Sequence, residues 1–412
     1  MMNRVTRAMA TLAGLMLAGA GLTVTTAAPA AAGVEDCPEG YFCGWSNNTV
    51  TGPMWKTNKD VAYMGGWDNS IHAYVNRTNA VACLYDAAGY DTSKGSDWLE
   101  PASAEGYPYY ENMNGTISSI RFVQDRHECD VPDYPSWMSS THSPGPRDFG
   151  DMDGNGQADV ISRDRAGRLW FTPGDSTGRL IGTGGWNAMN ALTRHGDFTG
   201  DGHEDLIARE ASTGRLWLYP GTGTGTGGLG SRTLIGTGGW NGMRNVTAYG
   251  DLTGDGRPDL IASEKSTGRL YLYPGTATGG LGTRKLIGTG GWNAMNALAG
   301  MGDTDGDGHP DLYAREASTG RLWLYPGTRT GGLGSRTLIG TGGWNTMGHL
   351  LAVGDFTGDT TPDLAAVTDD TYMIDGWLEG PGLLFAYTGR GDGRLESGRR
   401  VDDSWWGFTD VC

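Results

Sequence analysis

The chain has 412 residues, 71 of them glycine, and a formal net charge of −16. Residues 1–32 carry Arg4 and Arg7 and no acidic residue, so the rest of the chain has a charge of −18. Such an acidic protein is a poor partner for nucleic acid, whose phosphates are bound by Lys and Arg. Beyond residue 32, about 380 residues are too many for one ordinary core, so we expect two domains.

The first residues have the features of a secretory signal peptide. Arg4 and Arg7 precede an apolar run that ends in small residues at Ala30 to Ala32. The run is short for a membrane span and no stop-transfer flank follows it. We therefore expect a signal peptide at residues 1–32, cleavage near Ala32, an extracellular protein and no membrane insertion.

Four of the five cysteines lie before residue 130, so the chain divides into a cysteine-rich front and an almost cysteine-free back. In an exported protein they are expected to be oxidised. Cys37 and Cys43 are six residues apart, which suits a small bridged loop. The preferred map pairs Cys83 with Cys129 and leaves Cys412 free. The alternative joins Cys129 to Cys412, because a ring-shaped back domain would bring its ends together.

The front domain, residues 33–129, contains two related β motifs. "YFCGWS" (41–46) and "VACLYDAAGY" (81–90) begin 40 residues apart, and each is followed downstream by a polar turn. Ile117, Ile120 and Phe122 are typical of half-buried strands. Two such units predict a small sandwich. The segment that follows, 130–146, is rich in proline, which predicts a semi-rigid linker.

The motifs "CPEGYFC" and "CLYDAAGY", with the polar turn before a strand, resemble the microbial metalloproteinase-inhibitor family. The resemblance implies a βγ-crystallin-like fold of two Greek keys. It also implies a secreted protease as a possible partner; the alternative is a stable accessory module.

Residues 147–412 are an internal repeat. "REASTGRLWLYPGT" occurs at 209–222 and again, letter for letter, at 315–328. Five units contain an acidic loop, a short apolar strand, "RLWLYPG"-like and "RTLIGTGG"-like segments and a further strand. Four strands in about 52 residues, without helical periodicity, are the pattern of a propeller blade. The last unit departs from the repeat: it has "DDSWWGFTDVC" where the others have "GGWN". This departure is consistent with a strand that closes the ring from one chain end.

The acidic loops carry clear metal chemistry. Their first, third, fifth and ninth positions supply side-chain oxygens, the seventh a carbonyl, and a glycine at the sixth allows a sharp turn, which suits Ca²⁺. So many carboxylates in short turns repel one another without a cation. The candidate calcium ligands are Asp151, Asp153, Asn155, Asp159, Asp197, Thr199, Asp201, Asp205, Asp251, Thr253, Asp255, Asp259, Asp303, Asp305, Asp307, Asp311, Asp355, Thr357, Asp359 and Asp363.

These loops resemble those of the FG-GAP or integrin-type propeller repeat. The whole chain is therefore expected to be all-β, with a small βγ-crystallin-like Greek-key sandwich followed by a five-bladed β-propeller. The fourth loop has the most aspartates and is expected to bind calcium most tightly. The fifth has Thr360 in place of the glycine, so its turn is expected to be strained and its site weakest.

The stretch "LIGTGGWN" recurs four times, with its tryptophans 54, 52 and 52 residues apart. Each ring either packs between blades or forms a sugar platform beside an asparagine amide, and the sequence leaves both interpretations open. The candidate ligand-binding residues are Trp186, Asn187, Trp240, Asn241, Trp292, Asn293, Trp344 and Asn345.

No nucleophile elbow, zinc motif or P-loop is present in the sequence. The first hypothesis is a secreted, non-enzymatic, calcium-stabilised protein that binds glycans. The alternative is a secreted peptidase inhibitor acting through the front domain.

Overall fold

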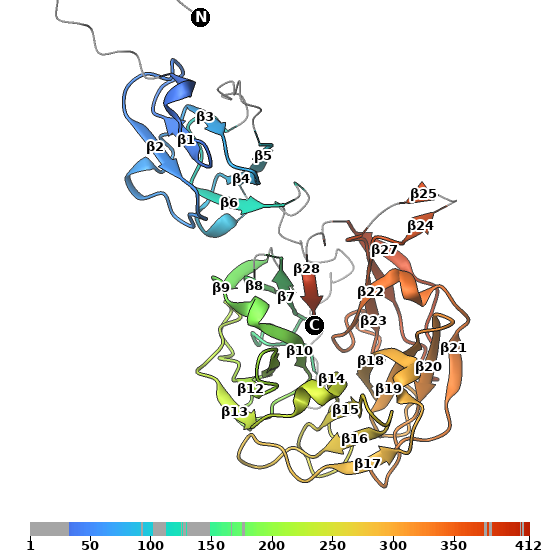
Figure 1. Ribbon diagram of the computed structural model, residues 1–412. Coiled ribbons are helices and arrows are strands. Elements are labelled where there is room, and N and C mark those ends of the chain that lie inside the picture. Colours follow the sequence, from blue (N-terminus) through green and yellow to red (C-terminus); the bar gives the residue numbers. More distant parts are fainter. Residues whose placement is uncertain are drawn as a thin grey trace, which may run out of the picture.

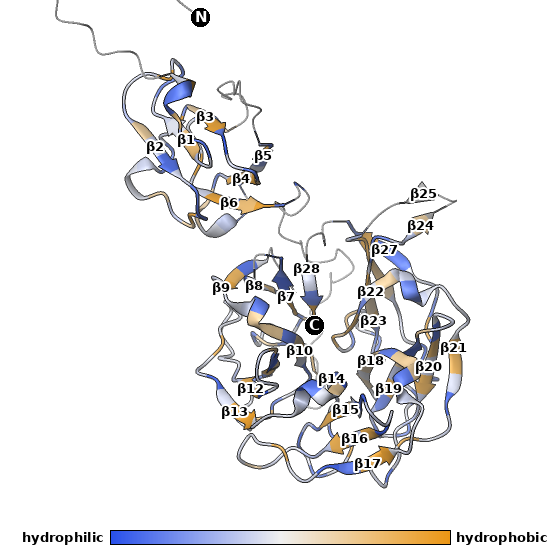
Figure 2. Cartoon of the chain, viewed as in Figure 1, coloured by the Kyte–Doolittle hydropathy of each residue, from blue (hydrophilic) through white to orange (hydrophobic). Residues whose placement is uncertain are grey.

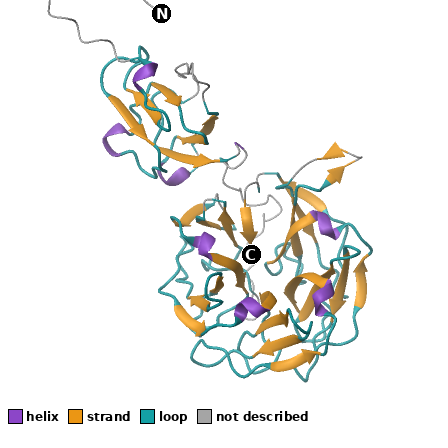
Figure 3. Ribbon diagram, viewed as in Figure 1, coloured by secondary structure: helices purple, strands orange, loops and turns teal. Residues whose placement is uncertain are grey.

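The computed structural model describes residues 33–91, 94–101, 113–124, 126, 129, 149–165, 167–174, 178–374, 377–378, 381–403, 405 and 408–412. The expected signal peptide and the whole of the expected linker, residues 130–146, lie outside these residues. Within the described part of the chain, no helix is long and apolar enough to span a membrane. The fold is all-β, with two bodies of sheet and only single-turn 3-10 helices (Figure 3).

The front domain consists of two three-stranded antiparallel sheets, ordered β2-β1-β3 and β5-β4-β6 (Figure 1). Their strands and turns are β1 (Phe42–Trp45), β2 (Met54–Thr57), β3 (Ala73–Asn76), β4 (Val81–Tyr85), β5 (Ser96–Leu99), β6 (Ser119–Val123), η1 (Val34–Asp36), η2 (Gly65–Trp67) and η3 (Ala88–Tyr90). Phe42 and Tyr74 from the first sheet pack with Leu84 and Ile120 from the second in one buried cluster. The two sheets therefore share a core, as expected for a sandwich.

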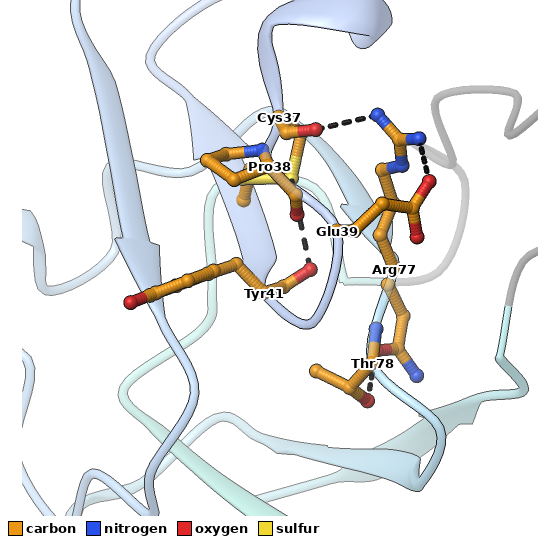
Figure 4. The surroundings of a disulfide bond; sticks show 8 residues. Cys37, Pro38, Glu39, Tyr41, Arg77 and Thr78 are labelled. Atoms are coloured by element: carbon orange, nitrogen blue, oxygen red, sulfur yellow. Dashed lines mark hydrogen bonds and ion pairs between the residues drawn. A yellow bond between two sulfur atoms is a disulfide. The ribbon is translucent and has the colours of Figure 1, made fainter.

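Both disulfides of the preferred map are present, Cys37–Cys43 and Cys83–Cys129, and Cys412 is free. Arg77, which follows β3, contacts the small loop closed by the first bridge. Its guanidinium donates to the carbonyl of Cys37 and pairs with Glu39 (Figure 4). This contact ties the loop to the end of β3.

The back domain contains five four-stranded antiparallel sheets, numbered here along the chain. The first is β28 (Phe408–Val411), β7 (Val160–Asp164), β8 (Leu169–Thr172) and β9 (Arg179–Gly182). The second is β10 (Met189–Arg194), β11 (Leu206–Glu210), β12 (Leu216–Tyr219) and β13 (Thr233–Gly236). The third is β14 (Met243–Ala248), β15 (Leu260–Glu264), β16 (Leu270–Tyr273) and β17 (Lys285–Gly288).

The fourth sheet is β18 (Met295–Gly302), β19 (Asp311–Glu316), β20 (Arg321–Tyr325) and β21 (Thr337–Gly340). The fifth is β22 (Met347–Ala352), β23 (Leu364–Thr368), β26 (Leu384–Tyr387) and β27 (Arg399–Asp402), with an inserted hairpin of β24 (Met373–Ile374) and β25 (Trp377–Leu378). Figure 2 shows the apolar segments along many of these strands.

The first strands of the five sheets surround one centre. In turn, β28, β10, β14, β18 and β22 each contact the next, and β22 contacts β28, so the cycle is closed. The first sheet obtains its inner strand from the far end of the repeat, because β28 pairs antiparallel with β7. The expected closing strand is therefore found, and the architecture is propeller-like.

The sheets and the sequence units are offset by one strand. Short 3-10 turns, η5 (Trp186–Ala188), η6 (Trp240–Gly242), η7 (Trp292–Ala294) and η8 (Trp344–Thr346), connect the last strand of each sheet to the first strand of the next. The tryptophan of each repeat therefore stands at a seam between neighbouring sheets.

Closure by β28 predicts a sensitive position at Val411, whose side chain is 5 % exposed and packs with Val160 and Ala365. Val411→Asp would bury a carboxylate among apolar groups and is expected to cost about 3 kcal/mol or more. Chemical denaturation of the full chain measures this. Thr337→Asp, at an exposed strand position, is the control; equal effects of the two would show that β28 does not close the ring.

Candidate calcium and ligand sites

The five acidic loops occupy equivalent places. Four connect the first strand of a sheet to its second strand, and the loop at 151–159 leads into β7, whose inner neighbour is β28. All five loops therefore lie at the same end of the strands of their sheets.

The aspartate at the first position organises each loop. In the fourth loop, Asp303 Oδ1 accepts hydrogen bonds from the backbone N–H groups of Gly306 (2.8 Å) and Asp307 (3.1 Å), and Oδ2 accepts one from Gly308 (2.8 Å). The same pattern is present at Asp151, Asp197, Asp251 and Asp355. These hydrogen bonds fold the loop into a tight turn, which also carries the side chains of the third and fifth positions.

The aspartate at the ninth position is fully buried in all five loops. Asp311 Oδ2 accepts from the backbone N–H and the hydroxyl of Thr304, at 3.0 and 2.5 Å, and Oδ1 accepts from Gly327 N–H at 2.9 Å. Burial raises the pKa of this carboxyl to about 6. The pKa values of its counterparts are also raised by burial, to about 8 at Asp159, 6 at Asp205, 6 at Asp259 and 7 at Asp363. A bound cation would favour the charged form that burial disfavours.

Three loops gather carboxylate oxygens within 4.8 Å of one another. The groups are Asp151, Asp153 and Asp159; Asp197, Asp201 and Asp205; and Asp303, Asp305 and Asp311. Carboxylate oxygens in this number suit a hard divalent cation. Among the described residues, the third and fifth loops form no equally close group.

At the third position of the second and third loops, the threonine hydroxyl lies beside the first aspartate. Thr199 Oγ1 donates to Asp197 Oδ1 at 3.2 Å, and Thr253 Oγ1 to Asp251 Oδ1 at 3.4 Å. The predicted carboxylate ligands are thus brought together in the first, second and fourth loops, and a hydroxyl lies next to the first carboxylate in the second and third loops.

The fifth loop differs at its sixth position. Thr360 adopts a positive φ of 75°, where the other four loops have glycine at 85–91°. A β-branched residue is strained in this conformation. The strain expected from the sequence is therefore present.

The tryptophans at the seams lie mainly between sheets. Each ring contacts a tyrosine of the next sheet, with centroid distances of 4.9 Å for Trp186–Tyr219, 4.5 Å for Trp240–Tyr273, 4.7 Å for Trp292–Tyr325 and 4.7 Å for Trp344–Tyr387. Trp240 and Trp292 are buried, and the other two are half-buried. A Cβ at Gly288 would lie 2.1 Å from Trp292 Nε1, so the glycine of "LIG" is required for the ring to fit.

The asparagine that follows each tryptophan fastens the turn. Its side-chain amide donates to a backbone carbonyl in the preceding sheet, of Arg165 for Asn187, Ala211 for Asn241, Lys265 for Asn293 and Ala317 for Asn345. These contacts give the Trp-Asn pair a structural role at each of these four seams. The edge of Trp240 additionally lines a cavity.

That cavity, of about 420 Å³, lies at the seam between the second and third sheets. It is lined by Trp240, Glu264, Lys265, Tyr273 and Arg284, together with neighbouring small residues. Lys265 Nζ donates to the carbonyl of Asn241 at 2.9 Å, and Arg284 lies 3.4 Å from a Glu264 carboxylate oxygen. The site combines an aromatic edge with two cations and one anion.

Sequence reasoning singled out Trp240 in this cavity but not its charged residues. The signal was a departure from the repeat: Lys265 stands where the corresponding segments of the second and fourth sheets have Ala211 and Ala317.

Comparison with known proteins agrees with the expected order of domains. Residues 30–96 match the model of peptidase inhibitor family I36, and residues 197–262, 251–314 and 303–366 match that of the FG-GAP-like repeat. No curated protein matches the chain significantly.

Several solved structures share low similarity with the chain. An Agrocybe aegerita lectin that recognises non-reducing terminal N-acetylglucosamine is 14 % identical, with 89 % of this chain and 91 % of that chain covered and a TM-score of 0.36. The Photorhabdus luminescens Tc holotoxin pore is 14 % identical, covering 81 % and 15 % of the two chains, with a TM-score of 0.32. A luciferin-regenerating enzyme is 11 % identical, covering 59 % and 76 %, with a TM-score of 0.31.

Calcium is expected to raise the melting temperature of the back domain, because it would bind the folded loops and not the unfolded chain. Each site would add about 2.7 kcal/mol at a free concentration one hundred times its Kd. Scanning calorimetry with calcium and with a chelator measures this. The disulfide-bonded front domain is the internal control, and identical melting curves under both conditions would contradict the expectation.

Replacing Thr360 by glycine is expected to stabilise the fifth loop by about 1–2 kcal/mol, because the positive φ no longer strains a side chain. Calcium titration should also show tighter binding at this loop. The reverse change in the fourth loop, Gly308→Thr, is the matched control and should weaken its site. An unchanged melting temperature and affinity in Thr360→Gly would show that the turn carries no strain.

Trp292→Ala is expected to cost roughly 3–5 kcal/mol, because it leaves a cavity between two regular sheets. Urea unfolding of the full chain measures the loss. Asn293→Ala, which removes one hydrogen bond at the same turn, should cost about 1 kcal/mol. A loss below 1 kcal/mol in Trp292→Ala would mean that the ring does not hold the seam.

Proposed function

We propose that the protein is a secreted, non-enzymatic glycan-binding protein, whose five repeated sheets are the blades of a calcium-stabilised β-propeller. The observation that supports glycan binding is the cavity at the seam between the second and third sheets. It is open, and it is lined by two aromatic residues and by several groups that can donate or accept hydrogen bonds.

Sugar rings have apolar faces and many hydroxyl groups, so they favour sites where aromatic side chains stand beside polar ones. Trp240 and Tyr273 supply the aromatic surface, while Glu264 can accept hydrogen bonds from hydroxyls. Lys265 and Arg284 supply two positive charges against the single charge of Glu264. A sugar that carries a carboxylate therefore suits this cavity better than a neutral one.

The other seams lack the same combination. At the position of Lys265, the Trp186, Trp292 and Trp344 seams have Ala211, Ala317 and Asp369, as the backbone hydrogen bonds from these residues to the Trp turns show. The first sheet has Arg165 at this position, but its seam with the fifth sheet has no "LIGTGGWN" turn. Among the four seams with such a turn, a cation at this position is therefore specific to the Trp240 seam, whereas the tyrosines and arginines recur in the neighbouring sheets. Binding is accordingly proposed at this seam first.

A second candidate function is peptidase inhibition by the front domain, here proposed to be a βγ-crystallin-like pair of Greek keys. It is favoured by the match of residues 30–96 to peptidase inhibitor family I36. The loop closed by Cys37 and Cys43 lies inside the matched segment, and its bridge and the Arg77 contact hold it in one conformation. Titration of purified secreted peptidases with the full chain tests this function.

Lys265→Ala converts the cavity to the composition of the Trp186 and Trp292 seams. We expect it to weaken binding of a uronic-acid polysaccharide about tenfold, because a charged hydrogen bond is lost. Isothermal titration of the unmodified chain and the variant with acidic and neutral polysaccharides measures this. The control is Arg336→Ala. Arg336 is the fourth-sheet equivalent of Arg284 and lies outside this cavity, so its loss should leave binding unchanged.

Absence of binding to a broad glycan array would contradict the glycan proposal. Binding that is unaffected by Lys265→Ala but lost on Arg336→Ala would place the site at another seam.

A further inference from the structure

The aromatic residue in the middle of the third strand is covered differently in the first sheet than in the second, third and fourth sheets. Trp170, Trp217, Tyr271 and Trp323 are equivalent, because each pairs across the sheet with the leucine of a "LIG" segment. In the second to fourth sheets, the arginine two residues before that leucine lies over the ring. The distances from the guanidinium carbon to the ring centroid are 4.1 Å for Arg232, 4.0 Å for Arg284 and 3.9 Å for Arg336.

The first sheet has Gly178 at the position of this arginine. The guanidinium over the Trp170 ring belongs instead to Arg121 of β6 in the front domain. Its central carbon lies 5.1 Å from the ring centroid of Trp170. Trp170 is fully buried, whereas Tyr271 is 8 % exposed and Trp217 and Trp323 are half-buried. The front domain thus supplies the cap that the repeat itself lacks here.

The leucine beside the ring shows the same difference. Leu234, Leu286 and Leu338 are 39, 49 and 37 % exposed, whereas Leu180 packs against a cluster that contains Val81, Tyr90 and Val123 of the front domain. The ring of Tyr90 also lies 6.2 Å from that of Trp170. A leucine that is open to solvent on the second, third and fourth sheets is therefore packed against the front domain on the first.

An ion-pair network completes the contact. Arg168 is 2 % exposed and donates through Nε to Asp164 at 2.7 Å, while its other end pairs with Asp60 of the front domain. The equivalent residues in the next three sheets, Arg215, Arg269 and Arg321, are exposed. Asp164 also accepts from Trp170 Nε1 at 2.9 Å. Because this arginine is buried, loss of its front-domain partner would leave a charge poorly compensated.

We propose that the outer face of the first sheet is a docking site for the front domain of the same chain, with Arg121 in the role of the missing arginine. The front domain is thus held by its β4–β6 side and does not move freely on the segment at 130–148. In the loop closed by Cys37 and Cys43, Glu39 and Gly40 are exposed, so the loop remains accessible to a partner in the docked arrangement.

A cleavage site for a sequence-specific protease, placed within residues 130–148 of the full chain, tests the docking. After cleavage, the two fragments are expected to co-elute in size-exclusion chromatography. The Cys83–Cys129 bridge remains within the front fragment. Separation of the fragments of the otherwise unmodified chain would overturn the proposal.

Arg121→Glu and Trp170→Ala in the cleavable chain are expected to abolish co-elution. Trp323→Ala, at the equivalent position of the fourth sheet, is the matched control and should retain it. If Trp170→Ala does not fold, as judged by circular dichroism, Arg121→Glu decides, because it changes only the front domain. Co-elution that survives Arg121→Glu would show that Arg121 does not serve as the cap.

Discussion

Each sheet of the back domain depends on one buried carboxylate at the end of its acidic loop. One oxygen of this aspartate accepts N–H groups from the start of the loop, and the other accepts the N–H of a glycine that follows the third strand. It therefore joins two turns that lie at the same end of the sheet. Hydrogen bonds to a charged group contribute more than neutral ones, yet burial of the charge opposes them, as the raised pKa values show. The remaining acidic residues of the loop are held close by this arrangement, and a cation would relieve their repulsion.

The seams between sheets combine apolar packing with buried polar contacts. At the Trp240 seam the ring rests on Tyr273, while the Arg209 guanidinium donates to the carbonyls of Trp240 (3.1 Å) and Met243 (2.9 Å). Arg315 forms the same contacts with Trp344 and Met347. The turn is thus fixed both through its ring and through its backbone. Such a seam can tolerate small residues around the tryptophan, because the position of the turn does not depend on the packing of the ring alone.

The repeats made much of this arrangement predictable. A fixed spacing of the acidic loops and of "LIGTGGWN" indicated similar units of four strands. The clustering of cysteines favoured the two disulfides that are present, but it left a Cys129–Cys412 bridge open, and the structure excludes that bridge. The position of the tryptophans was harder to predict, because glycine and asparagine around a ring are compatible with a pocket or with a tight turn. Only the structure shows that Gly288 is needed for Trp292 to fit. The contact of Arg121 with Trp170 joins residues 49 positions apart in different domains, and no local pattern encodes it. The inserted hairpin β24–β25 likewise breaks the repeat without a signal of its own.

The pairing of β28 with β7 also determines the order in which the molecule can be completed. The first sheet, although its other three strands come first, stays one strand short until residues 408–411 have been synthesised. The intervening sheets contain strands that are consecutive apart from the small hairpin, so each can form locally. Contacts across a long stretch of chain form slowly, because the entropy of loop closure must be met first. During synthesis the edge of β7 would be unpaired, and an unpaired edge invites association with other chains.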